Sequence, residues 1–126
     1  MGGVENWTVE FGTPGFDSVS AIAVDAQGVY LIGTTDNVFS GQQNMGGFDA
    51  FVAAFDLNGT ARWVRQFGTA LNDASEAIAW KSDGSYVVGS TDGAFPGQTN
   101  VGGVDAFIRR YDTTWTNAWT VQFGSN

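Results

Sequence analysis

The chain repeats itself every 56 residues. A heptapeptide that begins with tryptophan occurs at residues 7–13, 63–69 and 119–125, so successive copies are 56 positions apart without a gap. About 24 of the 56 positions are identical between residues 7–62 and residues 63–118. Repeats of this length are typical of folds that stack one supersecondary unit on the next, because a single unit cannot bury its apolar face alone. The sequence therefore predicts two complete units and the start of a third.

Each repeat has the pattern of four short β-strands. In the first repeat we expect strands at residues 20–24, 29–34, 49–55 and 62–67, and the second repeat has the same plan. Turns rich in Asp, Asn and Gly follow the first and third strands, and such turns between β-rich runs indicate hairpins. A glycine-rich loop at residues 35–48 joins the second strand to the third. No helical periodicity of useful length is present.

Four antiparallel strands per repeat are typical of the blades of a β-propeller. We therefore predict an all-β fold of four-stranded antiparallel β-propeller blades, with one repeat unit spanning residues 1–126. Blade 1 is expected at residues 17–68 and blade 2 at residues 73–124, while residues 7–12 form an extra copy of the outermost strand. In this plan the long loops share one face of the disc, and the opposite face carries only tight turns.

Several motifs of the second repeat occur in a fixed order. They are Trp-Val-Arg-Gln-Phe-Gly-Thr at 63–69, Gly-Ser-Thr-Asp at 89–92, Phe-Pro-Gly-Gln-Thr-Asn at 95–100 and Gly-Gly-Val-Asp-Ala-Phe at 102–107. These motifs resemble the SBBP-type β-propeller repeat of bacterial, often surface-associated, proteins. The resemblance implies a scaffold with an extracellular or cell-surface location and no shared catalytic residues. The two copies depart from each other at turns, where Trp80 replaces Val24, Lys81 replaces Asp25, and residues 112–115 replace the Asp-Leu-Asn-Gly turn at 56–59.

Composition excludes several functions. The net charge is -8, with only five Lys and Arg residues, so a basic surface for nucleic acid or for an anionic membrane is not expected. The chain has no Cys and no His, which excludes disulfides, Cys nucleophiles and His general bases. No apolar run reaches the roughly 18 residues of a membrane span. The first residues show no signal peptide, because they lack a basic region and a long apolar run.

Polar residues in and beside the long loops are the first candidate ligand-binding group. They are Asp36, Gln42, Asn44, Asp49, Asp92, Gln98, Asn100 and Asp105. Oxygen ligands in glycine-rich loops suit Ca²⁺, but the spacing is not that of an EF-hand. Asp also caps turns and accepts backbone N–H bonds within loops, and we favour this structural role. We predict no metal and no cofactor.

Aromatic residues and paired acids are the other candidates, the first for sugar binding and the second for glycoside hydrolysis. Trp63 and Phe67 recur in every heptapeptide, and we expect them between adjacent sheets rather than on a sugar-stacking surface. Trp80 and Trp115 do not repeat, so they are the better candidates for surface binding. Paired carboxylates serve glycoside hydrolysis, but every candidate acid recurs in the next copy, as a structural role predicts. We therefore predict no catalytic residues and no enzymatic activity.

The sequence favours a non-enzymatic interaction scaffold with a protein or glycan partner on the long-loop face. The alternative is a repeat lectin with one shallow sugar site per blade on that face. The sequence contains three copies of the outermost strand but only two sets of the inner strands. This mismatch has two explanations. The chain is a section of a longer propeller, or copies join head to tail into a closed trimer or tetramer. We predict the second, a closed homo-oligomer in which the segment around Trp7 or Trp119 is exchanged between chains or disordered.

Overall fold

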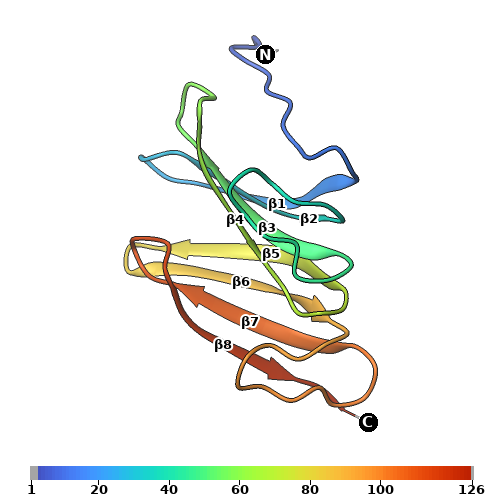
Figure 1. The fold of residues 1–126 in the computed structure, drawn as a ribbon. Coiled ribbons are helices and arrows are strands. Elements are labelled where there is room, and N and C mark those ends of the chain that lie inside the picture. Colours follow the sequence, from blue (N-terminus) through green and yellow to red (C-terminus); the bar gives the residue numbers. More distant parts are fainter. Residues whose placement is uncertain (1–2, 126) are drawn as a thin grey trace.

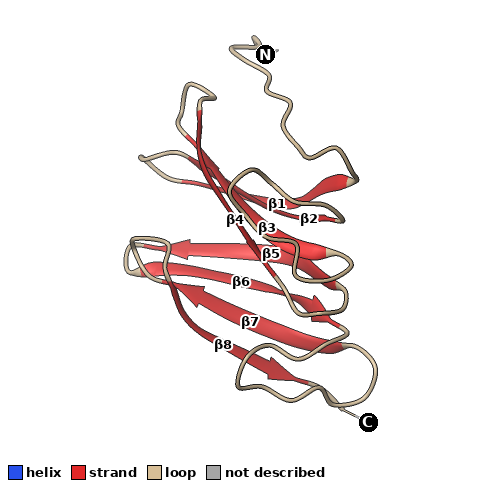
Figure 2. Ribbon diagram, in the orientation of Figure 1, coloured by secondary structure: helices blue, strands red, loops and turns tan. Residues whose placement is uncertain are grey.

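The computed structural model describes residues 3–125, which form eight β-strands and no helix (Figures 1 and 2). The strands make two separate four-stranded sheets in the orders β1-β2-β3-β4 and β5-β6-β7-β8, and every neighbouring pair is antiparallel. The strand bounds are β1 (Asp17–Val24), β2 (Val29–Thr35), β3 (Asp49–Phe55), β4 (Ala61–Phe67), β5 (Asp73–Lys81), β6 (Gly84–Thr91), β7 (Asp105–Tyr111) and β8 (Asn117–Phe123). The expected all-β fold with two four-stranded antiparallel sheets is confirmed. We call the first sheet with its loops blade 1 and the second blade 2.

The two sheets have equivalent registers 56 residues apart. Asp17 pairs with Thr35 in the first sheet, and Asp73 pairs with Thr91 in the second. Both first strands carry a bulge, which at β1 lies between Val19 and Ala21. The bulge explains why β1 begins three residues before the predicted start at residue 20. One extra residue breaks the alternation of side chains on which the sequence-based boundary depends.

The tight turn between β3 and β4 shows why an Asp begins each such turn. The Asp56 carboxylate accepts the backbone N–H groups of Asn58 at 2.8 Å and Thr60 at 2.9 Å. Gly59 has φ +85°, a conformation that glycine adopts without strain. In blade 2 the equivalent residue is Trp115, which keeps the left-handed conformation with φ +59°. The turn therefore has the same shape in both blades, although its sequence differs.

The core lies between the two sheets, which are stacked one above the other in Figure 1. Small and branched side chains of β2 and β3, such as Ile32 and Val52, face Val87 and Phe107 of blade 2. The strand β5 lies against β1, β2 and β3 and joins the sheets along one edge. Phe67 is buried in this core, as predicted, and the Arg109 guanidinium lies over its ring at 4.4 Å. The two blades thus bury their facing apolar sides against each other.

The aromatic pair of β4 is buried unequally. Trp63 is half-buried, less than the sequence predicted, whereas Phe67 is almost fully buried. The difference follows from position, because Trp63 lies near the rim of the sheet contact, where its ring packs at a tilt against that of Trp115 with centroids 5.2 Å apart. Both side chains still point toward blade 2, as residues four apart on a strand must.

Residues 7–12 are not a strand in the single chain and pair with neither sheet. The expected extra strand is therefore absent from the described part of one chain, where this extended segment instead lies against the free face of blade 1. The segment is anchored by Phe11, which packs on the cluster of Phe39, Phe51 and Phe55. β8 already occupies the place beside β7 that an extra strand would take.

Candidate binding surfaces

The long loop of each blade is fastened by a glutamine of its last strand. In blade 1 the side-chain oxygen of Gln66 accepts the N–H of Phe39 at 3.0 Å. Its amide nitrogen donates to the carbonyl of Asn37 at 2.7 Å and to the Asp49 carboxylate at 2.9 Å. Gln122 makes the corresponding bonds in blade 2. The candidate residues predicted from the sequence do not include these glutamines. Their recurrence within the repeated heptapeptide is the signal that identifies them.

The four predicted amide side chains hold the same loops. Gln42 and Gln98 each accept the backbone N–H of the last-strand glutamine in their own blade, at 2.9 Å in both. Asn44 and Asn100 each donate to two carbonyl oxygens near the start of their loop. These amides therefore close each long loop onto itself and onto the adjacent strand.

Asp49 and Asp105 lie at the base of the loops and are buried. One oxygen of Asp49 accepts the N–H of Met45 at 2.7 Å, and Asp105 accepts that of Val101 at the same distance. The other oxygen of each carboxylate has no hydrogen-bond partner among the described residues. It is packed against glycine, since a Cβ on Gly68 would come within 2.7 Å of the Asp49 oxygen. Both carboxylates are enclosed by their own blade.

Asp36 and Asp92 each accept a hydrogen bond from the residue just before the first strand of their own blade. Asp36 accepts the N–H of Phe16 at 2.7 Å, and Asp92 accepts the side-chain N–H of Asn72 at 3.2 Å. The eight predicted polar residues therefore form two separate groups, one per blade, whose hydrogen bonds serve the loops. Within residues 3–125 no group of three or more acidic side chains has the arrangement of a metal site. A ligand role for these residues stays a prediction.

Asp73 fastens the connection between the blades. Its carboxylate accepts the backbone N–H of Thr69 at 2.7 Å and the Thr69 hydroxyl at 3.1 Å. Burial raises the pKa of Asp73 above its usual value, and hydrogen bonds from Thr91 and Thr69 offset part of that rise. Desolvation of the charged form is the stronger effect here.

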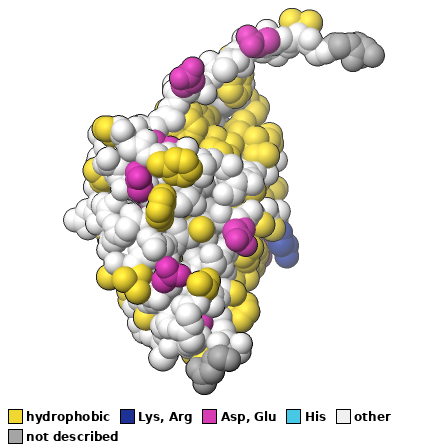
Figure 3. Space-filling view, turned by 90° about the vertical axis from the view of Figure 1, so that its right-hand side faces the viewer, with side chains coloured by type: hydrophobic (Ala, Val, Ile, Leu, Met, Phe, Trp, Pro, Cys, Tyr) yellow, Lys and Arg dark blue, Asp and Glu magenta, His cyan; other side chains and the backbone are white. Residues whose placement is uncertain are grey.

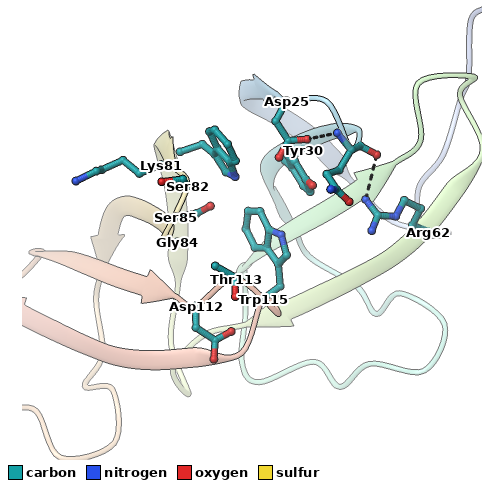
Figure 4. Close-up of a pocket in the computed structure, with 12 residues that line it drawn as sticks. Asp25, Tyr30, Arg62, Lys81, Ser82, Gly84, Ser85, Asp112, Thr113 and Trp115 are labelled. Atoms are coloured by element: carbon teal, nitrogen blue, oxygen red, sulfur yellow. Dashed lines mark hydrogen bonds between the residues drawn. The ribbon is translucent and has the colours of Figure 1, made fainter.

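A slot of about 240 Å³ opens between the blades on the face of the tight turns (Figure 4). One wall comes from the first turn of blade 1, with Asp25 and Tyr30, and the other from Trp80 to Ser85 of blade 2. Trp115 lies between these two walls (Figure 4). We call this feature the turn-face slot, and it lies on the face opposite the long loops.

The two non-repeating tryptophans have different environments. Trp80 is 43% exposed and lines the turn-face slot, and its predicted role in ligand binding stays a prediction. Trp115 is only 7% exposed and belongs to the core between the blades, and its predicted role in ligand binding stays a prediction. Its left-handed backbone turns the indole inward, where the ring stacks on Tyr30 at 4.7 Å.

Each blade has one face that no sheet covers within the described chain. On blade 1 this free face carries the cluster of Phe39, Phe51 and Phe55 under the N-terminal segment, and Figure 3 shows apolar side chains gathered beside that segment. On blade 2 the free face includes Trp119 and Phe123 of β8, which are 41% and 57% exposed. Such apolar faces are typical of interaction surfaces.

In comparisons with known proteins, no family model matches this sequence, and no curated protein matches it significantly. Within residues 3–125 there is also no helix long and apolar enough to cross a membrane.

Proposed function

We propose that the chain is a non-enzymatic interaction scaffold, a two-blade unit of a β-propeller that joins head to tail with further copies of itself into a closed ring. The observation that supports this proposal is the position of residues 7–13. They lie on the free face of blade 1 as β4 lies on blade 2, and so occupy the place of a preceding blade.

The aromatic contacts of the segment repeat with the 56-residue period. Phe11 has ring-centroid distances of 6.2, 6.2 and 5.0 Å to the rings of Phe39, Phe51 and Phe55. Phe67 lies 56 positions later, at 6.4, 6.0 and 6.4 Å from the equivalent rings of blade 2, which are Phe95, Phe107 and Tyr111. The free face of blade 1 therefore accepts the Phe of a β4-like strand in the manner of an ordinary blade contact.

The two ends of the segment also make the contacts that the ends of β4 make on blade 2. Trp7 lies over Gly59, since a Cβ there would come within 2.8 Å of its ring, just as Trp63 lies against Trp115. The N–H of Thr13 donates to the Asp17 carboxylate at 2.7 Å, the same distance as in the equivalent connection between the blades. The segment thus matches the β4 contact from its first aromatic residue to its last hydrogen bond.

The free face of blade 2 in a second copy can compete with residues 7–13 for the free face of blade 1. Trp119 and Phe123 of β8 stand 56 residues after Trp63 and Phe67 and point away from blade 1, largely exposed. A second copy would place them on the free face of blade 1 in place of Trp7 and Phe11. The segment fills that face incompletely, because an apolar hollow of about 140 Å³ remains between it and β2. A complete blade offers more apolar surface to such a face than one extended segment.

Head-to-tail contacts of this kind are heterologous, and they close only when the rotation per chain divides a full turn. Two blades per chain then give a ring of six blades from three copies or of eight from four. The acidic residues recur in both blades and cap loops, which supports a scaffold without catalysis. The resemblance to SBBP-type repeats supports the same interpretation.

Sedimentation velocity and native mass spectrometry of the full chain test this proposal. We expect a discrete trimer or tetramer at micromolar concentration, and Phe123→Asp should give a folded monomer because it charges the docking face. Val104→Asp, on the long-loop side and similarly exposed, is the matched control and should leave assembly unchanged.

A second variant tests the competition directly. Trp7→Ala combined with Phe11→Ala should strengthen assembly, because a tethered segment competes at an effective concentration of about millimolar. A wild-type chain that stays monomeric and folded at micromolar concentration would overturn the proposal. So would a Phe123→Asp variant that assembles like the wild type.

A further inference from the structure

We propose that the turn-face slot binds a single neutral sugar ring, with Trp80 stacked on one face of the ring. The slot lies within one chain, so this proposal goes beyond the assembly proposed above and holds equally for a single copy and for a ring.

The differences between the two repeats converge on this slot. Trp80 and Lys81 replace Val24 and Asp25 along β5, and Trp115 replaces Gly59 in a turn of the same blade. These substitutions come from two separate turns, yet the three substituting residues all line the slot. A purely structural role predicts that repeats keep the same residues at the same contacts, as they do at the base of the long loops. The divergence therefore marks a feature found only at the junction within the chain.

The Trp115 backbone adds an independent observation. A bulky residue with φ +59° has a strained left-handed backbone, and such strain persists where the surrounding structure holds it, often at functional sites. Here it holds the indole between the two walls of the slot. The slot therefore has a fixed aromatic floor.

Two residues that are mostly buried present hydroxyl groups to the slot. Tyr30 and Ser85 are 3% and 1% exposed, both line the slot, and neither hydroxyl hydrogen-bonds to a protein group among residues 3–125. In blade 2 the equivalent tyrosine, Tyr86, accepts a hydrogen bond from Arg110 at 3.3 Å. Blade 1 has Ala54 in place of that arginine, so the Tyr30 hydroxyl is left free. A hydroxyl can both donate and accept a hydrogen bond, so a ligand hydroxyl in the slot is a suitable partner for each.

The charged side chains of the slot either hydrogen-bond within their own blade or point away from the centre of the slot, which argues against an ionic ligand. The Asp25 carboxylate accepts the N–H of Gln27 at 2.7 Å, and the Arg62 guanidinium reaches the Gln27 carbonyl at 3.5 Å. The Asp112 carboxylate accepts the N–H and hydroxyl of Thr114, and these bonds lower the pKa of Asp112. In Figure 4 the Lys81 side chain points away from Trp115. Free hydroxyls beside aromatic faces, without free charge, suit a neutral polyhydroxylated ring.

The size of the slot limits the ligand to one ring. Its volume of about 240 Å³ is below the usual range of about 300–1,000 Å³ for sites that bind drug-sized molecules. A pyranose lying against the indole of Trp80 brings hydroxyls within reach of Tyr30 and Ser85 at the floor. A longer glycan would extend from the slot into solvent.

Isothermal titration calorimetry of the full chain tests the proposal. The probes are methyl glycosides of glucose, galactose, mannose and N-acetylglucosamine, with glucuronic acid as the charged comparison. We expect one neutral glycoside to bind with a Kd of about millimolar, weakened about tenfold or more by Trp80→Val. Valine is the residue at the equivalent position of the first repeat, so this change keeps a side chain suited to the strand.

Matched variants make the result interpretable. Phe48→Ala removes an exposed aromatic side chain of similar accessibility on the long-loop face and should leave binding unchanged. Ser85→Ala should weaken binding while leaving the melting temperature close to that of the wild type. The proposal is overturned if no glycoside binds at tens of millimolar, if only glucuronic acid binds, or if Trp80→Val leaves the Kd unchanged. Loss of binding in Phe48→Ala would overturn it as well, because it would place the sugar on the long-loop face.

Discussion

Replacement of Trp115 by alanine and by glycine separates two effects that coincide at this residue. The indole is buried between the blades, where its ring stacks on Tyr30 at 4.7 Å and packs at a tilt against Trp63 and Tyr111 at 5.2 and 5.5 Å. The backbone at the same residue has a left-handed φ of +59°. One effect stabilises the fold through packing, and the other opposes it through strain.

The magnitudes follow from these two contributions. Trp115→Ala removes a buried Trp side chain and should lower the free energy of unfolding by about 3–5 kcal/mol, while the left-handed strain remains. Trp115→Gly loses the same packing but relieves about 1–2 kcal/mol of strain. Glycine also gains entropy in the unfolded chain, which reduces its advantage by about 0.5–1 kcal/mol. We therefore expect Trp115→Gly to be more stable than Trp115→Ala by up to about 1.5 kcal/mol.

Urea unfolding followed by far-ultraviolet circular dichroism measures both variants without relying on tryptophan fluorescence. All samples should be compared at one protein concentration, because assembly would stabilise the folded state. The control is Thr113, an exposed residue of the same turn without a left-handed backbone, where alanine should be at least as stable as glycine. If alanine equals or exceeds glycine at residue 115, the strain argument is refuted. If both variants cost less than about 1 kcal/mol, the core role of Trp115 is wrong.

Two further predictions concern the core and the pH dependence of stability. Trp63→Ala should lower the free energy of unfolding by about 2–4 kcal/mol, since the side chain is only half-buried, and a loss below about 1 kcal/mol on urea unfolding would contradict its place in the core. Burial raises the pKa of Asp73, so its protonated form favours the fold and the wild type loses stability as pH rises above the usual value of 3.8. Asp73→Asn should therefore gain stability relative to the wild type as pH rises from about 3 to 7. Hydrogen bonds from Thr114 lower the pKa of Asp112, so Asp112→Asn should show the opposite trend over the same urea series, and parallel trends would refute both assignments.

The strand plan was predictable because local signals and the repeat agree. The predicted strand at residues 49–55 is the observed β3, since the long loop and an Asp-Leu-Asn-Gly turn bound it on both sides. The start of β1 was missed because the bulge after Val19 interrupts the side-chain alternation. The predicted outermost strand at residues 7–12 is not a strand in one chain, because the strand it would pair with is absent from that side of blade 1.

The candidate site was less predictable because it is formed by tertiary contacts. The polar residues lie in the long loops or, for Asp49 and Asp105, at the first residue of the strand that follows. Their recurrence in both repeats favours the structural role that their hydrogen bonds support. The slot has no local sequence pattern, since Tyr30, Trp80 and Trp115 come from distant turns that only the stacking of two blades brings together. The sequence shows that Trp115 replaces a glycine, but not that the left-handed backbone turns the indole into the core.

Residue 10 indicates whether β8 or residues 7–12 of a neighbouring copy pairs with β7 in an assembled ring. Both β8 and residues 7–12 of a neighbouring copy fit beside β7 of blade 2. Gln122 of β8 donates its amide to the Gly93 carbonyl at 2.8 Å and to the Asp105 carboxylate at 2.9 Å. Glu10 occupies the same position of the repeat and has no amide hydrogens to donate. Its carboxylate would meet the buried Asp105 carboxylate, and burying two like charges together is costly.

We therefore expect β8 to stay in place and the segment to be displaced, and we expect Glu10→Gln to allow exchange of the segment between chains. The absence of cysteine makes a crosslinking test specific. Val9 corresponds to Val121, which pairs with Ile108, so Val9→Cys and Ile108→Cys would be cross-strand neighbours only in an exchanged ring. With Glu10 present, oxidation should give no disulfide between chains, whereas adding Glu10→Gln should produce one. A disulfide between chains that forms while Glu10 is present would show that its charge does not exclude the segment. Absence of the disulfide in both forms would show that residue 10 does not decide the competition, because the amide supplied by Glu10→Gln restores each hydrogen bond that Gln122 makes.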